Sequence, residues 1–392
     1  MSFNIALSGI QAINEQLEAV SNNIANAGTY GFKSSRANFA SVYAGDAANG
    51  VEVASLTQNI GQNGGLVNTG RSLDAMIQGR GFFTSRDAQG VVSYSRVGIF
   101  NTNADGYLVD ATGKRVQGYG PTTNGVMGTM GDIEIPTGQI PAVASTRVAY
   151  TGNMSDDWQT PAAAFNMNDQ NTYNMVKQSV VYDSLGNQHT VSQYFVKTNP
   201  TTVSVYYSVD GGATGAAHPL VFGTNGQITT GVTSPVITVP AAGAAPLTIN
   251  IDYTSTTKFA GEATTTTNRP NGYASGTFVG VELAEDGSIV AKYSNEQQQV
   301  VGTVAIATFP DEGSLVPTSD TTWVANANSG APLYTTPGVG LGGKLSKGSL
   351  EGSNVDITSE LVGLMTSQRN YQANSKVITA ENQMMQSLMQ AL

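Results

Sequence analysis

The sequence predicts a multidomain, mainly β protein: two β-rich domains, one inserted in the other, together with a coiled coil formed by the N- and C-terminal α-helices. Three observations predict this class. A heptad pattern starts at the N-terminus, a second one runs to the C-terminus, and short apolar runs separated by Gly-rich turns fill the sequence between them. With 392 residues, 45 of them Gly, the chain is long enough for two or three domains with many tight turns.

The N-terminal helix is expected over residues 3–26. Its apolar residues recur at spacings of four and three, which makes an uninterrupted heptad seam of Ala6, Ile10, Ile13, Leu17, Val20 and Ile24. At 1.5 Å per residue, this helix is about 36 Å long. Gly28 is expected to end it as the C′ residue.

The C-terminal helix is expected from residue 356 to the end of the chain, with Asp356 as its N-cap. One seam position is filled every seventh residue by Ile357, Leu364, Tyr371, Ile378, Met385 and Leu392. The adjoining position holds Leu361 and Met389, with the polar Gln368, Ser375 and Asn382 between them. We expect the two terminal helices to pair and to leave apolar surface for other copies of the chain.

The segments between the helices are assigned from their strand and turn patterns. We expect an outer β domain from residues 71–146 and 271–335, and an inserted β domain from residues 147–270. Residues 1–30 and 356–392 form the predicted coiled-coil domain, and 31–70 and 336–355 the predicted connectors. Gly-rich stretches at 61–65 and 338–343, the latter with Gly340, Gly342 and Gly343, are interpreted as flexible linkers that act as hinges.

Composition excludes several classes of function. The net charge is -10 and no basic run occurs, which argues against nucleic acid or an anionic membrane as partner. The chain has no Cys, so thiol catalysis, disulfides and thiolate metal sites are excluded. The N-terminal residues lack the basic start and apolar run of a cleavable signal peptide, and no apolar run approaches the ~18 residues of a membrane span.

Motifs for catalysis or for cofactors are weak throughout. His189 lies on a predicted hairpin and His218 precedes a proline, and both are interpreted as surface histidines. The G-x-G-x-x-G match at 338–343 has no surrounding βαβ unit, and the calcium-like run at 101–106 has Thr112 where a bidentate Glu is needed. We therefore expect no enzyme, no cofactor and no metal site. A secreted β-rich protein that binds or hydrolyses carbohydrate stays a remote alternative.

Motifs at both ends of the chain resemble one known family. The stretch SNNIANAGTYGFKSS, residues 21–35, resembles the N-terminal signature of the flagellar axial proteins, N-N-I-A-N-x-x-T-x-G-F-K. The stretch from Leu350, LEGSNVDITSELVGLMTSQRNYQAN, is similar to their C-terminal signature. NTGRSLDAMIQGRGFF and SYSRVGIFNTNADGYLVDATGKRVQGY are similar to the first outer β domain that rod and hook proteins share. The chain is identified as a member of this rod and hook family.

Within that family the flagellar hook proteins fit best. The alternative, a distal rod subunit, would be shorter and would lack the insertion at about 147–270. The resemblance implies a structural subunit of the extracellular flagellum, at the distal end of the basal body. It implies export through the flagellar type III export apparatus without signal cleavage, and addition under a hook cap protein to a tubular homopolymer. The curved polymer then acts as a universal joint, with a distal rod protein and a hook–filament junction protein as neighbours.

The resemblance also implies where each part of the chain lies and which residues matter. The terminal helices line the inner tube, the outer β domain forms a middle shell, and the inserted domain forms the outer surface. The expected interface between copies comprises Ala6, Ile10, Ile13, Leu17, Val20, Ile24, Ile357, Leu361, Leu364, Tyr371, Ile378, Met385 and Met389. The signature residues expected to shape the exit from the coiled coil are Asn22, Asn23, Asn26, Gly28, Gly31, Phe32, Lys33, Gln368, Arg369 and Asn374.

Overall fold

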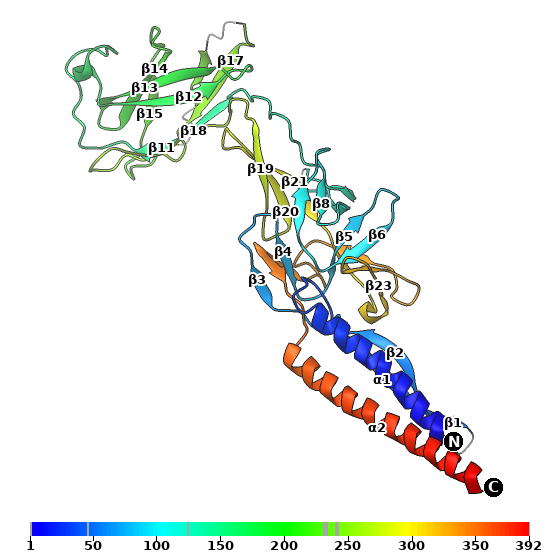
Figure 1. Ribbon diagram of the computed structural model, residues 1–392. Helices are drawn as coiled ribbons and strands as arrows, with labels where there is room; N and C mark the ends of the chain where they lie inside the picture. The colour runs from blue at the N-terminus through cyan, green and yellow to red at the C-terminus, as the bar shows by residue number, and fades with distance from the viewer. Residues whose placement is uncertain (1, 45–46, 124, 230–233, 240–242, 392) are drawn as a thin grey trace. The chain divides into compact units, whose positions relative to one another are not determined.

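The computed structural model describes residues 2–44, 47–123, 125–229, 234–239 and 243–391. The chain forms two compact units (Figure 1). The first comprises Met1–Thr137, Gly280–Lys292 and Gln298–Leu392, and the second Gly138–Val279 and Tyr293–Gln297. The structure confirms the predicted class, because strands dominate both units and the two terminal helices contact each other.

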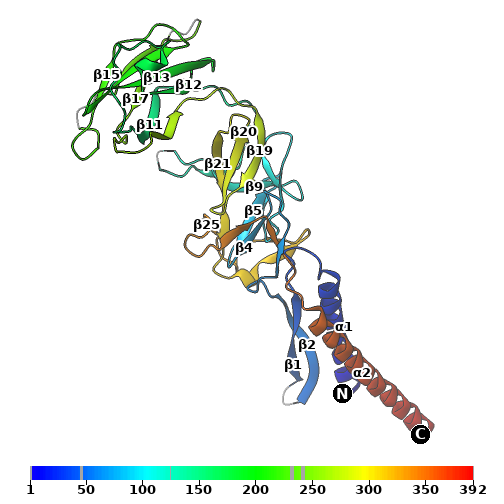
Figure 2. The same cartoon turned by 90° about the vertical axis from the view of Figure 1, so that its left-hand side faces the viewer.

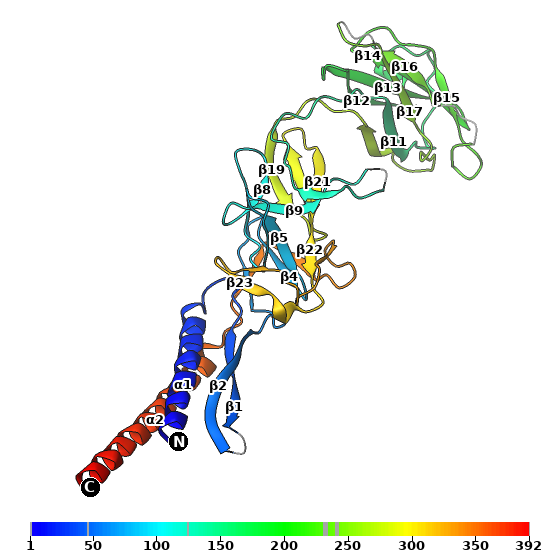
Figure 3. The same cartoon turned by 90° about the vertical axis from the view of Figure 1, so that its right-hand side faces the viewer.

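Helices α1 (Ser2–Ala25) and α2 (Ile357–Ala391) lie side by side and run in opposite directions, so that both chain ends lie at the same end of the pair (Figures 1 and 3). Asp356 caps α2 as predicted: its Oδ1 accepts a hydrogen bond from the Thr358 amide at 3.0 Å. The hydrogen bond from the Ser359 hydroxyl, followed by that from the Thr358 amide, lowers the pKa of Asp356.

The end of α1 differs from the prediction. Gly28 does not have the positive φ of a C′ glycine. Instead the Asn26 amide bonds the carbonyls of Asn22 and Asn23 at 3.1 and 3.2 Å, and the Asn26 side chain donates to the Asn22 carbonyl at 2.9 Å. Because the Asn26 side chain bonds a carbonyl of the last turn, the helix ends without a left-handed glycine.

A β-hairpin occupies the region predicted to be a connector. Strands β1 (Ser35–Ala44) and β2 (Ala47–Gln58) pair antiparallel and pack along α1 (Figure 2). Small residues allow this packing: Ala12 and Ala19 of α1 are buried. The Val51 amide donates to Ser8 Oγ at 3.2 Å. The sequence does not predict this hairpin, because many of its apolar residues are alanine and its apolar contact is made with a helix.

The β part of the first unit is built around a 13-stranded sheet with the main order β19-β20-β21-β9-β5-β6-β24-β23. Its core is aromatic: the Phe82 ring contacts Trp323 at 5.5 Å between centroids, and Tyr94 contacts Phe309 at 4.8 Å. Segments far apart in the sequence therefore share one core. The strands of this sheet are β5 (Phe82–Arg86), β6 (Val92–Ser95), β7 (Phe100–Thr102), β8 (Leu108–Asp110), β9 (Arg115–Tyr119), β10 (Met130–Asp132), β19 (Phe278–Leu283), β20 (Ser288–Tyr293), β21 (Gln298–Val304), β22 (Ile306–Thr308), β23 (Val316–Thr318), β24 (Thr322–Val324) and β25 (Leu333–Thr335), and the 3-10 turn η2 (Glu312–Ser314) precedes β23.

Two small sheets join this core to the helices. Strand β3 (Leu66–Asn68) pairs with β27 (Ser349–Glu351), and β4 (Ala75–Gln78) pairs with β26 (Lys344–Lys347). Each pair joins a segment that follows the N-terminal hairpin to a segment that precedes α2. The segment that follows α1 and the hairpin is therefore paired with the segment that leads into α2.

The glycine stretch at 338–343 is a packed turn and not the flexible linker that the sequence suggests. The Gly338 amide bonds the Gly343 carbonyl at 2.9 Å, and the Gly343 amide bonds the Arg80 carbonyl at 2.8 Å. A Cβ on Gly343 would lie 2.6 Å from the Gln78 carbonyl oxygen. Gly343 passes close to β4, a Cβ on Gly342 would lie 2.6 Å from Thr335 Oγ1, and Gly340 has a φ of +62°. These constraints argue against free hinge motion in the stretch.

The second unit is a β-sandwich of two four-stranded sheets, ordered β16-β17-β11-β18 and β12-β13-β14-β15. The predicted hairpin at 179–196 forms: Tyr182 pairs with Gln188 across a turn at the end of β12. The unit extends beyond the predicted 147–270 on both sides. Its elements are β11 (Arg147–Asn153), the 3-10 turn η1 (Gln170–Thr172), β12 (Met175–Tyr182), β13 (Gln188–Asn199), β14 (Thr202–Val209), β15 (His218–Val221), β16 (Val236–Val239), β17 (Leu247–Asp252) and β18 (Thr264–Pro270).

The core of the sandwich is large and includes a bonded polar group. The rings of Phe195 and Tyr150 lie 5.3 Å apart, and Tyr253 packs against both. The Tyr253 hydroxyl donates to Gln193 Oε1 at 2.5 Å and accepts from the Tyr207 hydroxyl at 3.1 Å, so these buried polar atoms have partners. Burial raises the pKa of Tyr207 and of Tyr253.

Phe195→Ala should lower the free energy of unfolding of the second unit by about 3–5 kcal/mol, because it leaves a cavity in the sandwich core. We expect urea denaturation of the full chain to show this loss in the transition of the second unit and no loss in that of the first. Val180→Ala, at an exposed site on the neighbouring strand, is the matched control and should change little. Equal losses in both variants would contradict the assigned core.

Candidate functional site: the terminal helices and their buried junction

The junction between the helices and the β core is built from the two signature segments. Asn23, at the end of α1, is buried. Its side chain pairs with both backbone groups of Ser35, donating to the carbonyl and accepting from the amide at 2.8 Å each. The same side-chain nitrogen donates to Glu360 Oε1 at 2.9 Å. One side chain thus fixes the end of α1 to the start of β1 and to the first turn of α2.

Asn354, from the C-terminal signature, makes a second clamp of the same kind. Its Oδ1 accepts from the Ser34 amide at 2.7 Å. Its Nδ2 donates to the carbonyls of Asn59 and Gln62 at 2.8 and 3.1 Å. Its backbone amide bonds the Phe32 carbonyl at 3.3 Å. Backbone on both sides of the hairpin is therefore held by a residue more than 290 positions away.

An ionic cluster lies at the centre of the junction. Lys33 Nζ is 2.6 Å from Glu351 Oε1, and both side chains are fully buried. The same carboxylate oxygen accepts from the Gly64 amide at 3.0 Å, and Lys33 also donates to the Gln62 carbonyl at 2.6 Å. Arg96 Nη1 lies 3.5 Å from the other oxygen, Glu351 Oε2. One carboxylate therefore serves two buried cations.

The surroundings of this cluster are poor in water and rich in backbone carbonyls. Burial lowers the pKa of Lys33, although the adjacent Glu351 carboxylate acts in the opposite direction. The Arg96 guanidinium lies over the Phe82 ring, 5.2 Å from its centroid, and donates to the Gly79 carbonyl at 2.8 Å. Such a cluster holds only if its anion stays in place, because removing one partner leaves a buried charge unpaired.

Gly31 is required at this junction, as the signature suggests. Its φ is +68°, and a Cβ there would lie 2.9 Å from Val97 Cγ2 and 3.1 Å from the Val97 amide nitrogen. Its amide bonds the Glu351 carbonyl at 2.7 Å. Both the left-handed conformation and the close approach exclude a side chain.

The contact between the helices follows one register. Asn23 lies opposite Glu360, a Cβ on Gly363 would lie 4.0 Å from Val20, and a Cβ on Gly9 would lie 2.9 Å from Asn374 Nδ2. On the α1 side the predicted seam faces inward: Ala6, Ile13 and Val20 are buried, while Ile10, Leu17 and Ile24 are half-buried. The glycines bring the helix backbones close together.

The seam predicted for α2 is only partly correct within one chain. Leu364 and Ile378 are half-buried as expected. The adjoining position that faces α1 is filled by Glu360, Ser367 and Asn374, one residue before the predicted Leu361, Gln368 and Ser375. The shift follows from Gly9, which admits Asn374, and from the hydrogen bond of Glu360 to Asn23. The predicted residues left exposed are Ile357, Leu361, Gln368, Arg369, Tyr371, Met385 and Met389; Leu392 lies outside the described residues.

The sequence indicated Lys33 and the asparagines through their motifs, but it did not indicate Arg96 or Glu351. Arg96 stands in the segment that resembles the outer β domain, and Glu351 is the second residue of the stretch that resembles the C-terminal signature. For Arg96 the available signal was a charged residue beside the apolar run Val97–Phe100, whereas Glu351 stands in a Gly- and Ser-rich stretch that gives no such signal. Neither charge could be paired without the fold.

The histidine on the predicted hairpin has a more defined setting than a surface position. His189 Nδ1 lies 2.7 Å from Asp210 Oδ2, and Nε2 lies 3.6 Å from Asp183 Oδ2. The hydrogen bond with Asp210 raises the pKa of His189 above its ordinary value. Asp210 has a positive φ of 49° and also accepts from the Thr190 amide at 2.7 Å. The pair therefore holds a strained turn in place.

The described residues offer neither a metal site nor a membrane-spanning helix. Among the residues that the structure describes, no group of three or more His, Asp and Glu side chains could hold a metal ion. Within the same residues, no helix is both long and apolar enough to cross a membrane.

Comparisons with known proteins agree with the placement of the two signatures. Four family models match separate segments: Flagella basal body rod protein (residues 3–33), Flagellar hook protein FlgE/F/G D1 domain (76–155), Flagellar basal body protein FlaE D2 domain (153–273) and Flagellar basal body rod FlgEFG protein C-terminal (346–391). The two outer models cover the segments that meet at the junction.

Full-length relatives carry one name. The Flagellar hook protein FlgE of Salmonella typhimurium is 37% identical over 400 residues, with 99% of both chains covered. That of Escherichia coli is 36% identical with the same coverage, and that of Treponema pallidum is 30% identical, covering 98% of this chain and 97% of its own. The crystal structure of the Helicobacter pylori flagellar hook protein FlgE2 has a similar fold, with a TM-score of 0.54 at 12% identity over 73% of this chain and all of that one.

Glu351→Gln should lower the free energy of unfolding of the first unit by about 3–5 kcal/mol, because it keeps the size of the side chain but leaves Lys33 and Arg96 without an anion. Chemical denaturation of the full chain measures this loss. Glu282→Gln, which breaks the exposed pair with Lys292, is the control and should cost no more than about 1 kcal/mol. Similar losses in the two variants would show that the buried cluster contributes no more to stability than an exposed ion pair.

The second unit should lose stability as pH rises through the folded pKa of His189. The pKa of this group is raised in the folded state, so its contribution is fully present below about pH 6.5, its unfolded value, and is lost above that. Urea denaturation midpoints between about pH 6 and 9 measure the slope, since the aspartates titrate well below this window. His189→Gln should remove the slope. A slope that survives in this variant would mean that another group causes it.

Proposed function

Since this chain belongs to the flagellar hook protein family, whose members are structural subunits of the bacterial flagellar hook, we propose that its terminal helices join many copies of it into a tubular helical polymer. The single observation that carries this proposal is the outer face of α2. Leu361, Val362 and Met365 are exposed on a helix whose inner face already packs on α1. Exposed apolar surface of this kind marks a protein contact.

The contacts that such a surface makes do not close within one chain or one pair. A patch on α2 that meets a different patch on the next copy makes a heterologous contact, and repetition of such contacts builds a helical filament. Each large apolar side chain that becomes buried contributes about 1.5–3 kcal/mol. Several such side chains along one helix contribute enough free energy to offset the conformational entropy that a copy loses when it joins the polymer.

The junction suits a subunit that transmits torque. A force applied to the helices passes into the β core through the clamps of Asn23 and Asn354 and through the ion pair of Lys33 and Glu351. All three groups bond atoms that are distant in sequence. Asn23, Lys33 and Glu351 are buried, and several hydrogen bonds hold each clamp, so we expect the link between helices and core to be stiff in each copy. In this proposal, bending of the universal joint comes from sliding between copies, where charged residues are few, at 12% of the chain.

The finer assignments of location and partners rest on the family. We place the chain in the extracellular hook, added under a hook cap protein after export through the type III apparatus, with rod and hook–filament junction proteins at the two ends of the polymer. The absence of Cys suits a chain that crosses the cell envelope unfolded, because no disulfide has to form afterwards. The inserted sandwich, matched over residues 153–273, favours the hook over the distal rod.

Ile13→Asp should abolish polymerisation and leave both β units folded, because it places a carboxylate in the buried seam between α1 and α2. Sedimentation and electron microscopy of the purified protein measure polymer formation, and near-ultraviolet circular dichroism measures folding of the β units. Asn14→Asp, at the exposed neighbouring position, is the control and should polymerise normally. Curved tubes formed by the Ile13→Asp variant would refute the role given to the helices.

A further inference from the structure

The two helices differ in length, and their register leaves one end of α2 without a partner. α1 has 24 residues and α2 has 35. The register that places Val20 opposite Gly363 and Gly9 opposite Asn374 runs out where Ser2 faces Glu381. Residues 382–391 therefore extend beyond α1 by about 15 Å at 1.5 Å per residue. This extension, called the overhang below, is visible at the C-terminal end of α2 in Figures 1 and 3.

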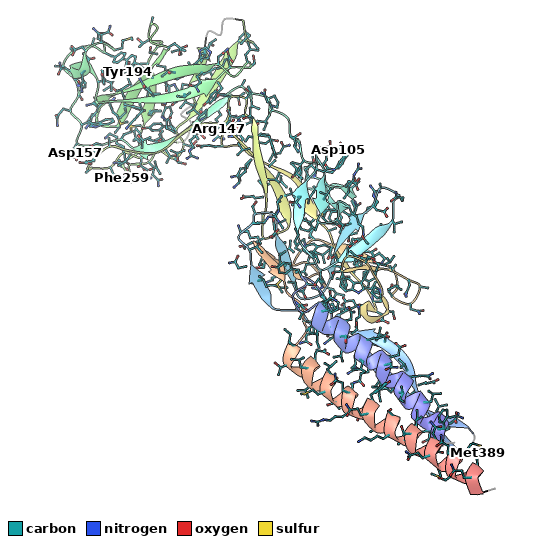
Figure 4. All side chains as sticks on the ribbon, viewed as in Figure 1. Asp105, Arg147, Asp157, Tyr194, Phe259 and Met389 are labelled. Carbon is teal, nitrogen blue, oxygen red and sulfur yellow. The ribbon has the colours of Figure 1, made fainter. Side chains whose placement is uncertain are left out.

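The overhang has one apolar face. Met384, Met385, Leu388 and Met389 are 60–71% exposed. At 100° per residue they share an arc of roughly 140°, with Gln383, Gln386 and Gln390 on the opposite side. Met389, labelled in Figure 4, stands near the free end of the helix. Three of these four side chains are methionines. Because the methionine side chain is unbranched and flexible, such a face can fit a groove of irregular shape.

The same chain offers a groove of matching chemistry. A cavity of about 320 Å³ lies between the middle of α1, the hairpin and α2, and its lining includes Gly9, Ala12, Ile13, Phe39, Val51 and Ala373. Phe39 is 44% exposed although it is a large apolar residue. Gln16, Asn370 and Asn374 line it as well, so the groove is mostly but not wholly apolar. It is open and adjoins the contact between the helices.

A second, larger cavity nearby does not match. It has a volume of about 520 Å³ and lies closer to the junction. Its lining is mostly polar and includes Ser34, Arg36, Thr57 and Glu360. Methionine side chains would leave these groups without hydrogen bonds, which costs free energy.

We propose that the overhang of one copy packs its methionine face into the apolar groove between α1 and the hairpin of a second copy. The overhang starts beyond the first residue of α1 and so does not reach the groove of its own chain. The polymer proposed above brings the same helices of other copies together, which makes a second copy the occupant. The contact is heterologous and repeats along the helix axis. It rests on the proposed function and specifies which surface of one copy meets which surface of the next.

Disulfide cross-linking tests the contact, because the chain has no cysteine of its own. One chain carries Met385→Cys and the other Val51→Cys, so that a bond between them can only join two copies. The two are mixed, polymerised and mildly oxidised. We expect at least tenfold more cross-linked dimer than from Gln383→Cys mixed with Val51→Cys, since Gln383 lies on the opposite face of the overhang. Disulfides form only where the two Cα atoms approach within about 7 Å.

A second measurement covers the case in which the cysteines themselves disturb the contact. Serine at Met385, Leu388 and Met389 together should raise the critical concentration for polymerisation at least tenfold. Serine at Gln383, Gln386 and Gln390 should leave it unchanged. Equal effects of the two triple variants would overturn the proposal.

The outcomes separate this proposal from the proposed function. If polymers form but Met385→Cys gives no more dimer with Val51→Cys than the control does, the contact is wrong and the hook function stands. A bond between Met385→Cys and Thr57→Cys would place the overhang in the polar cavity and would also overturn the proposal. If the unmodified protein forms no polymer, the proposed function fails first.

Discussion

The carboxylate of Glu351 is the group on which the arrangement of the first unit depends. Lys33 and Arg96 are both buried beside it, and no second carboxylate bonds either of them among the ion pairs of the described residues. Lys33 follows α1, Arg96 belongs to the β core and Glu351 precedes α2, so the cluster joins three segments. Two buried cations without an anion would be unstable, and the three segments therefore have to come together at once or not at all.

The asparagine clamps around this cluster satisfy the backbone where regular structure stops. The end of a helix and the start of a strand both leave amides and carbonyls without partners. Asn23 and Asn354 supply one acceptor and one donor group each, in the arrangement that a peptide group would offer. Because an asparagine carries both on one short side chain, it can bridge two backbones that a longer residue would push apart. This explains one asparagine in each signature, Asn23 and Asn354.

The helix pair combines weak internal packing with a large external apolar surface. Its inner contact contains Gly9, Ser367, Asn374 and Glu360 as well as apolar residues, so it fixes register more than it contributes hydrophobic stability. The larger side chains of α2 face outward. In the proposed polymer, neighbouring copies cover these outward side chains and add to the stability of the helix. The second unit, with its own sandwich core, does not depend on that event.

The sequence by itself determined the class of the protein, the two terminal helices, the hairpins of the sandwich and the inward seam of α1. These features depend on local periodicity and on turn residues, whose effect on the backbone does not require contacts with distant parts of the chain. Only the tertiary structure decided the rest. The hairpin at 35–58 packs against small residues of α1, and its own apolar alternation is short and rich in alanine. The inner face of α2 is set one residue earlier than its apolar pattern indicates, because Gly9 and Asn23 fix the register. The charges of Arg96 and Glu351 lie 255 positions apart, and only a fold that buries both could show that they belong together.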